Sequence, residues 1–200
     1  MNNTLLKNYP PIILASNSPR RKSLLELIDL PFKVVAGSVH EDFNIDLSPI
    51  EFAKHYAQLK ALDVVKRYPD SLVIGADTIV VLEGEIIGKP LDEADSKLML
   101  KKLSGRTHIV ITGVSLVWQE KNIVDTFFEE TKVTFQELTN EQIQYYVDNY
   151  HPLDKAGSYG IQDWFAVCVK KIDGCFYNVM GMPLSKFYSH FTKIINGIKL

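Results

Sequence analysis

The sequence predicts an α/β fold with a sheet of mixed strand direction. Two observations lead to it. Strand-like and helix-like segments alternate in the first half of the chain, whereas long β-rich runs follow one another in the second half. Because the 200 residues contain no internal repeat, low-complexity tract or Gly/Ser linker, we expect one continuous domain over residues 1–200.

The first half is predicted to alternate strands with well-capped helices. Ser18 before Pro19 is a favourable N-cap, and Ser48-Pro49-Ile50-Glu51 is a capping box with proline at the first helical position. Asp77 interrupts an apolar run, so we expect a strand on either side of it. The predicted elements are a strand at 12–15, a helix at 19–28, a strand at 32–36, a helix at 49–67, and strands at 72–76 and 79–82.

The second half is predicted to be richer in strands. Asp92 caps a helix at 93–103, and Thr139-Asn-Glu-Gln142 is a second capping box that opens a helix to about 149. Asp173-Gly174 is a two-residue turn signal, which predicts a hairpin of 165–172 with 175–179. The remaining predicted elements are β-rich runs at 108–118 and 123–138 and a final helix from 183.

Composition narrows the class of protein and of partner. Hydrophobic residues make up 46% and charged residues 23%, which is typical of a globular domain. The 22 Lys+Arg against 24 Asp+Glu give a net charge of −2, which argues against nucleic acid or a polybasic membrane contact. The apolar run at 72–82 is shorter than the roughly 20 residues that span a bilayer. We therefore expect no nucleic-acid partner and no membrane insertion.

Cysteine usage indicates a reducing compartment. Cys168 and Cys175 would lie several residues apart along the predicted hairpin, too far for a disulfide. No histidine or cysteine cluster accompanies them, so zinc is not expected either. We predict a reduced, cytoplasmic protein.

The segment Leu14-Ala-Ser-Asn-Ser-Pro-Arg-Arg21 is the first candidate for chemistry. A strand that ends in small polar residues and enters a helix N-terminus offers free backbone N–H groups to an anion. Ser16 adds a hydroxyl, while Arg20 and Arg21 add forked cationic donors suited to phosphate. The alternative is an ordinary capped helix with two solvated arginines, and the residues alone favour neither.

The remaining candidates are charged residues and one loop. A carboxylate at Asp77 must be exposed at a kink, paired, or bound to metal, because burying it alone is expensive. Glu41, Lys60 and Lys89 would each be solvated charges if considered singly. The glycine-containing loop at 154–162 ends in Gln162, whose amide can donate and accept toward a base edge; its composition alone favours a flexible surface connection.

Taken together, these segments resemble the Maf family of nucleoside triphosphate pyrophosphatases. The resemblance covers residues 12–188 in the right order, and no single motif carries it. The matching motifs are Leu14-Ala-Ser-x-Ser-Pro-Arg-Arg21, Gly75-Ala-Asp-Thr78, Gly88-Lys-Pro90, Leu103-Ser-Gly105, Leu153-Asp-Lys-Ala-Gly-Ser-Tyr-Gly-Ile-Gln162 and Gly181-Met-Pro-Leu184.

Membership would imply an elongated mixed α/β sheet with flanking helices, similar to the inosine-triphosphate pyrophosphatase fold, with a cleft between two lobes. It would imply hydrolysis of a nucleoside triphosphate to the monophosphate and pyrophosphate with a divalent cation, Mg²⁺ or Mn²⁺. The family is cytoplasmic, often dimeric, and linked to arrest of septum formation, so a homodimer is expected.

Three positions indicate the base preference that the resemblance implies. The subgroup similar to dTTP/UTP pyrophosphatases carries Arg, Thr and Gln where this chain has Arg20, Thr78 and Gln162; the methylated-GTP subgroup tends to carry an aromatic residue, Gln and Glu. Asp163-Trp164-Phe165 departs from the family, whose members commonly have small, Gly-rich residues there. The alternatives are a pyrophosphatase for a modified purine triphosphate and a non-catalytic nucleotide-binding division regulator.

The implied reaction then gives each candidate site residue an expected role. Cleavage of the α–β phosphoanhydride needs neutralisation of the triphosphate, a metal, and a group that activates water. We expect Asp77 to be that base or a metal ligand, with Glu41 beside it, because hard cations prefer oxygen ligands. The groups expected to contact the phosphates are Ser16, Arg21, Lys60 and Lys89.

Overall fold

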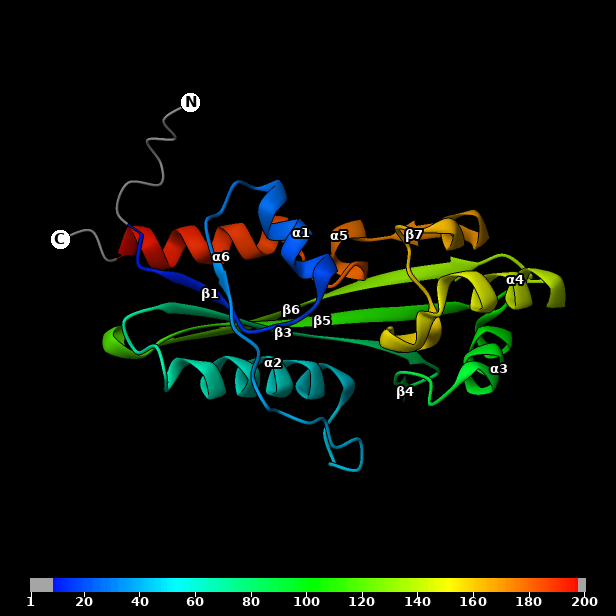
Figure 1. The fold of residues 1–200 in the computed structure, drawn as a ribbon, viewed down its shortest axis with the longest axis horizontal. Coiled ribbons are helices and arrows are strands. Elements are labelled where there is room, and N and C mark those ends of the chain that lie inside the picture. The colour runs from blue at the N-terminus through cyan, green and yellow to red at the C-terminus, as the bar shows by residue number, and fades with distance from the viewer. Residues whose placement is uncertain (1–8, 198–200) are drawn as a thin grey trace.

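The structure is a computed structural model that describes residues 9–197, so both ends of the predicted 1–200 domain lie outside the described residues. It contains a seven-stranded sheet in the order β2-β1-β3-β5-β6-β7, with β4 paired to β3 (Figure 1). The strands are β1 (Ile12–Leu14), β2 (Lys33–Val34), β3 (Leu72–Leu82), β4 (Glu85–Ile87), β5 (Thr107–Trp118), β6 (Ile123–Phe135) and β7 (Val169–Asp173).

Helices cover both faces of the sheet. In Figure 1, α2 lies on one face, α1 and α6 lie on the other, and α3 and α4 sit at the far end of the long strands. No helix between residues 9 and 197 is long and apolar enough to cross a membrane. The helices are α1 (Pro19–Leu27), α2 (Pro49–Val65), α3 (Glu93–Leu103), α4 (Asn140–Tyr150), α5 (Phe176–Val179) and α6 (Leu184–Gly197).

The strand directions confirm the mixed sheet. Strand β1 runs parallel to both β2 and β3, as expected where a helical crossover connects strands. Strands β3, β5, β6 and β7 are antiparallel neighbours, and the long pairings of β3 with β5 and of β5 with β6 make the sheet elongated. The predicted α/β class with flanking helices is therefore confirmed.

The predicted interruption of the sheet at Asp77 is wrong. Strand β3 is continuous, and Asp77 pairs in register with Gly113 of β5. A strand backbone can hold its ladder hydrogen bonds whatever side chain it carries. The cost of the buried carboxylate is offset by a pairing cation from another element, which a local pattern does not show.

The predicted hairpin across Asp173-Gly174 is also wrong. Residues 164–168 form a 3₁₀ turn, and β7 pairs with β6 instead of with the segment that follows it. The hydroxyl of Thr131 accepts the Cys175 N–H at 3.0 Å and donates to the Cys175 carbonyl at 3.1 Å. This contact holds the chain after the turn, where it enters α5. Both cysteines, Cys168 and Cys175, are free thiols.

Two glycines let α2 approach the sheet closely. A Cβ on Gly75 would lie 2.1 Å from the carbonyl oxygen of Ala57, and one on Gly113 would lie 2.3 Å from that of Ala53. Because both partners are backbone atoms of a packed helix, no side-chain rotation could relieve either clash. This close contact sets the height of α2, and with it that of Lys60, above the middle of the sheet.

A buried histidine joins the sheet to the loop after α4. His108 of β5 is 1% exposed, and its Nε2 lies 2.8 Å from the hydroxyl of Tyr159. Its ring packs edge-on against Phe135 and Tyr159, while its Nδ1 is buried without a hydrogen-bond partner. Burial lowers the pKa of His108 to about 4, so the imidazole is neutral at neutral pH.

This histidine should make stability depend on pH. Between its unfolded pKa of 6.5 and its folded pKa of about 4, the unfolded chain binds the proton and the folded chain does not, so acid favours unfolding. We expect the free energy of unfolding to fall by up to about 3 kcal/mol as pH drops through this window. Urea titrations at several pH values, compared with His108→Gln, should show a shallower slope in the variant. Equal slopes would contradict the assignment.

Candidate active site

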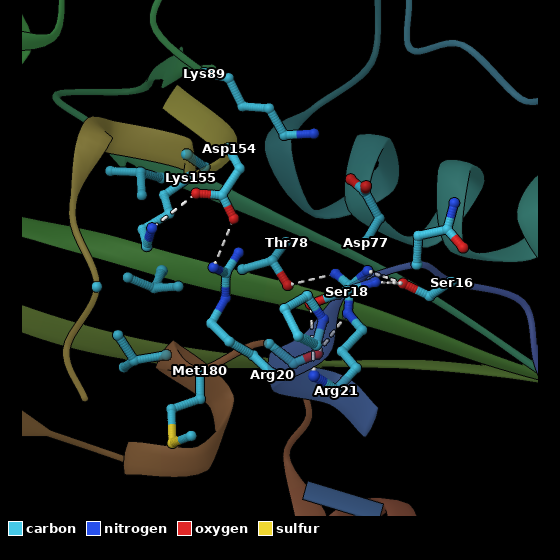
Figure 2. Close-up of a pocket in the computed structure, with 18 of the residues that line it drawn as sticks. Ser16, Ser18, Arg20, Arg21, Asp77, Thr78, Lys89, Asp154, Lys155 and Met180 are labelled. Atoms are coloured by element: carbon cyan, nitrogen blue, oxygen red, sulfur yellow. Dashed lines mark hydrogen bonds and ion pairs between the residues drawn. The ribbon is translucent and has the colours of Figure 1, made fainter. Parts of the chain in front are cut away.

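One cleft of about 550 Å³ collects the residues singled out from the sequence. It is lined by the end of β1, the start of α1, the segment before α2, the middle of β3 and the loop after α4 (Figure 2). All of the predicted site residues lie in its lining: Ser16, Arg20, Arg21, Glu41, Lys60, Asp77, Thr78, Lys89 and Gln162.

The centre of the cleft is an ion-paired triad from α2, β3 and the loop before α2. Lys60 of α2 donates to Asp77 Oδ1 at 2.6 Å and to Glu41 Oε1 at 2.5 Å. Glu41 is placed by its neighbour, because the Tyr56 hydroxyl accepts the Asp42 N–H at 2.7 Å and thereby ties this segment to α2. Residues far apart in sequence thus meet around one ammonium group.

The two carboxylates of the triad differ in their electrostatics. Burial raises the pKa of Asp77, and the attraction of Lys60 offsets this only in part. Burial acts in the same direction on Glu41, but the charge and hydrogen bond of Lys60, with help from Lys89, bring the pKa of Glu41 below its usual range. Of the two carboxylates, Asp77 is therefore the one that takes up a proton more readily.

Asp77 also holds the clearest signal of a missing ligand. Its side chain is 6% exposed, and its Oδ2 is buried without a hydrogen-bond partner, although the residue lines the cleft. A buried carboxylate oxygen without a partner is costly. A cation or a water molecule in the cleft would satisfy this atom.

Arg21 is anchored by the protein, so it is not one of the solvated arginines of the alternative interpretation. Its Nε donates to the Gly181 carbonyl at 3.0 Å, its Nη1 to Ser16 Oγ at 3.1 Å, and its Nη2 to Thr78 Oγ1 at 2.9 Å. Figure 2 shows the guanidinium between Ser16 and Thr78. These bonds leave further N–H groups of the guanidinium for a ligand, in a fixed orientation.

Arg20 lies on the opposite side of the same helix start and crosses the cleft. Its Nη1 pairs with Asp154 Oδ2 at 2.9 Å, and Asp154 Oδ1 accepts from Lys155 at 2.7 Å (Figure 2). Lys155 and Asp154 were not singled out individually, because a charged pair in a polar loop looks like an ordinary solvated surface.

Thr78 belongs to a chain of hydroxyl groups that was not predicted. Its Oγ1 lies 3.0 Å from Thr112 Oγ1, which in turn donates to the Asn178 carbonyl at 2.9 Å. Because the Thr112 hydroxyl donates its one proton to this carbonyl, the Thr78 hydroxyl must be the donor to Thr112. Thr78 therefore accepts from Arg21 and offers a ligand only a lone pair. Nothing in the sequence marks Thr112 except a polar residue in an apolar run.

The loop at 154–162 is held firmly, contrary to what its composition favours. Gly157 N–H donates to the Gly88 carbonyl at 2.9 Å, and the hydroxyl of Ser158 meets that of Ser96 in the buried interface with α3. Gly160 N–H donates to the Tyr146 hydroxyl at 2.9 Å. The loop is therefore an ordered wall of the cleft, with the exposed side chain of Gln162 at its end.

The described residues 9–197 contain no group of three or more His, Cys, Asp or Glu side chains that could hold a metal by themselves. Mg²⁺ is commonly bound by one or two carboxylates, water and the phosphates of a substrate. The unpartnered Oδ2 of Asp77, with the carboxylate of Glu41 across Lys60, fits such a site. The predicted pair of ligands is thus chemically consistent with a cation that a phosphate ligand helps to hold.

Two comparisons with known proteins cover most of the chain. The sequence profile described as Maf, Maf-like protein, matches residues 11–194. The chain belongs to the Maf family. Relatives named dTTP/UTP pyrophosphatase include one from Bacillus cytotoxicus, 47% identical over 92% of this chain and 96% of the relative. Two from Bacillus cereus are 48% and 49% identical, and cover 90% and 88% of this chain and 88% and 91% of their own lengths.

Among solved structures, the Ham1 protein of Staphylococcus aureus matches with a TM-score of 0.45 at 19% identity, covering 62% of this chain and 71% of that chain. We draw nothing further from this partial match. The Maf assignment rests on the sequence profile and on the curated relatives, both of which span most of the chain.

Mutations should distinguish a basic residue of this Maf cleft that only binds the ligand from one that also stabilises the fold. Lys89 makes no ion pair or hydrogen bond within the described chain, and Figure 2 shows its side chain reaching into the cleft. We expect Lys89→Ala to weaken binding of inorganic pyrophosphate about 10-fold, the scale of one charge-assisted hydrogen bond, with an unchanged Tm. Arg21→Ala should weaken binding and also lower the Tm, because it breaks three internal bonds.

Isothermal calorimetry with pyrophosphate and thermal melts would measure both effects, with Lys97→Ala on α3 as a control outside the cleft. Unchanged pyrophosphate binding by Lys89→Ala would contradict the assignment.

Proposed function

We propose that this protein hydrolyses nucleoside triphosphates, preferably dTTP and UTP, to the monophosphate and pyrophosphate. The curated relatives support the activity, since they carry the name dTTP/UTP pyrophosphatase at 47–49% identity over most of the chain. The single observation that carries the proposal is the buried Asp77, paired with Lys60 and lining a cleft rich in cations.

The residues divide the work of breaking the α–β phosphoanhydride. Lys60, Lys89 and the oriented guanidinium of Arg21 would neutralise the triphosphate, and the Ser16 hydroxyl lies beside them. A water molecule attacks the α-phosphorus and loses a proton to a base. The bond from the α-phosphorus to the bridging oxygen breaks, and pyrophosphate leaves with that oxygen. We assign that base to Asp77, whose raised pKa favours uptake of a proton.

A divalent cation, Mg²⁺ or Mn²⁺, is part of the proposal. Glu41 would hold it together with phosphate oxygens, in keeping with the oxygen ligands that these ions prefer, and Asp77 would be a second ligand if it is not the base. When bound, it would stabilise the negative charge of the phosphates.

Base recognition would use Arg20, Thr78 and Gln162, which line the same cleft. Thymine and uracil present a carbonyl, an imide N–H and a second carbonyl, so a pocket that reads them needs both donors and an acceptor. Gln162 offers both from one amide, Arg20 offers donors, and Thr78 has only a lone pair left to accept an N–H. These three residues form a set complementary to that edge.

Three expectations still rest on the family resemblance alone: a homodimer, a link to septum formation, and the division of the pyrophosphatase domain into two lobes. A location in the cytoplasm rests on the resemblance and on the cysteine usage. A nucleoside triphosphate is the partner that the proposed activity requires.

A pyrophosphate-release assay with dTTP, UTP, CTP and methylated GTP tests the proposal directly. We expect Asp77→Asn to keep the fold, because the amide oxygen can still accept from Lys60, but to lower turnover at least ~100-fold. Asp173→Asn, an exposed carboxylate on β7, is the matched control and should act like wild type. Release from methylated GTP alone would support the purine alternative, and tight binding without release would support the non-catalytic regulator.

Gln162→Glu tests the base preference. The change removes both amide donors and adds a negative charge that would face a carbonyl-rich edge. We expect activity on dTTP and UTP to fall roughly 10-fold or more, the scale of a lost hydrogen bond with a group left unpaired, while activity on methylated GTP falls less or rises. Specificity constants for the same substrates measure the effect, with Gln119→Glu, an exposed position outside the cleft, as a control. Equal losses on every substrate would assign Gln162 to the loop structure.

A further inference from the structure

A single tyrosine hydroxyl clamps the chain on both sides of Gln162. Tyr146 of α4 is fully buried, and its hydroxyl accepts the Gly160 N–H at 2.9 Å and donates to Asp163 Oδ2 at 3.0 Å. The residues tied to this one oxygen flank the Ile161-Gln162 dipeptide. The backbone of Gln162 is therefore held between two fixed points.

Asp163 completes the clamp from its own side. Its second oxygen, Oδ1, accepts the Phe165 N–H at 3.0 Å, so both carboxylate oxygens are engaged. Gly160 must lack a side chain for this arrangement, because a Cβ there would lie 2.4 Å from Asp163 Oδ2. Glycine at position 160 therefore allows the Asp163 carboxylate to lie close to the loop.

The segment Asp163-Trp164-Phe165, whose side chains depart from the family pattern, supplies the rest of the anchor. Phe165 is 1% exposed and packs its ring 4.8 Å from that of Tyr146, and the ring of Trp164 lies stacked over Tyr146 at 6.2 Å. These rings enclose the tyrosine. Burial, with the nearby Asp163 charge, raises the pKa of Tyr146, so its hydroxyl keeps its proton and stays a donor.

We propose that Tyr146 and Asp163 are positioning residues for base recognition, which fix the backbone from which the Gln162 amide reaches the pyrimidine edge. The inference rests on the proposed function, because it assigns a base-reading role to Gln162. Neither residue need touch the substrate: Tyr146 is buried, and its hydroxyl is spent on Gly160 and Asp163. A polar contact made from a fixed loop costs less ordering on binding than one made from a mobile loop.

The decisive variant is Tyr146→Phe, which removes one oxygen and keeps the buried ring. We expect the KM for dTTP and UTP to rise roughly 5- to 10-fold with kcat within about two-fold of wild type, since the phosphate side of the cleft is untouched. Discrimination of dTTP against dCTP should fall by a similar factor. Asp163→Asn, which loses one of two acceptor oxygens, should act in the same direction.

Tyr145→Phe is the matched control. Tyr145 is the neighbour on the same helix, is 47% exposed and also packs against Trp164, but its hydroxyl makes no hydrogen bond within residues 9–197. Removing its hydroxyl should change neither KM nor base discrimination.

A double-mutant cycle separates positioning from a general effect on the fold. If the Tyr146 hydroxyl acts through Gln162, then Tyr146→Phe should have less than about a two-fold effect on KM in a Gln162→Ala background. A full effect in that background would overturn the proposal. Loss of the folded state in both Tyr146→Phe and Asp163→Asn, seen in thermal melts, would assign the clamp to the fold and overturn it as well.

The wild-type assay distinguishes this inference from the function on which it rests. If the wild-type protein releases pyrophosphate from dTTP or UTP and Tyr146→Phe behaves identically, only the positioning role is overturned. If the wild-type protein acts on neither nucleotide, the proposed function fails, and the base-reading role of the clamp fails with it.

Discussion

The structure depends on the ion pair between Lys60 and the buried Asp77. A carboxylate in the middle of a buried strand is expensive unless a cation is paired with it at close range. That cation comes from α2, and it reaches the sheet only because Gly75 and Gly113 leave room for the helix backbone. The two glycines are therefore needed for the ion pair between Lys60 and Asp77 as well as for the packing of α2 on the sheet. A larger residue at either glycine would lift Lys60 away from Asp77 and leave an uncompensated charge.

Hydrogen bonds from a few side chains also explain how one cleft brings so many segments together. Arg21 alone links the end of β1, the middle of β3 and the chain before α6, through Ser16, Thr78 and the Gly181 carbonyl. Behind it, Thr112 fixes the direction of the Thr78 hydroxyl by donating its own proton to a backbone carbonyl. Arg21 and Thr78 are thus each oriented by groups of the protein itself, which is how a site becomes preorganised.

Local patterns predicted the elements well and the long-range contacts poorly. The capping boxes at Ser48 and Thr139 both form, because a cap is decided within one helical turn. The interruption at Asp77 and the hairpin at Gly174 were wrong because each depends on a distant partner, Lys60 in the first case and the hydroxyl of Thr131 in the second. Every residue singled out for the site lies in the lining of one cleft, although only the ordered set of motifs, and no single residue, pointed to it. The residues behind the lining were missed because a buried tyrosine on a helix looks like ordinary core.

The residues that bind the phosphates need to be held less rigidly than those that read the base, and the chemistry of the proposed ligand explains why. A triphosphate carries many equivalent oxygens, so a cation on a long, exposed side chain such as Lys89 can find one of them without being fixed beforehand. A pyrimidine edge presents three groups in a set order, and an amide displaced or rotated relative to them would face donor with donor. Discrimination among bases therefore requires a rigid support. The buried hydroxyl of Tyr146, with Asp163 and Gly160 closed around it, is the part of the structure that meets this requirement.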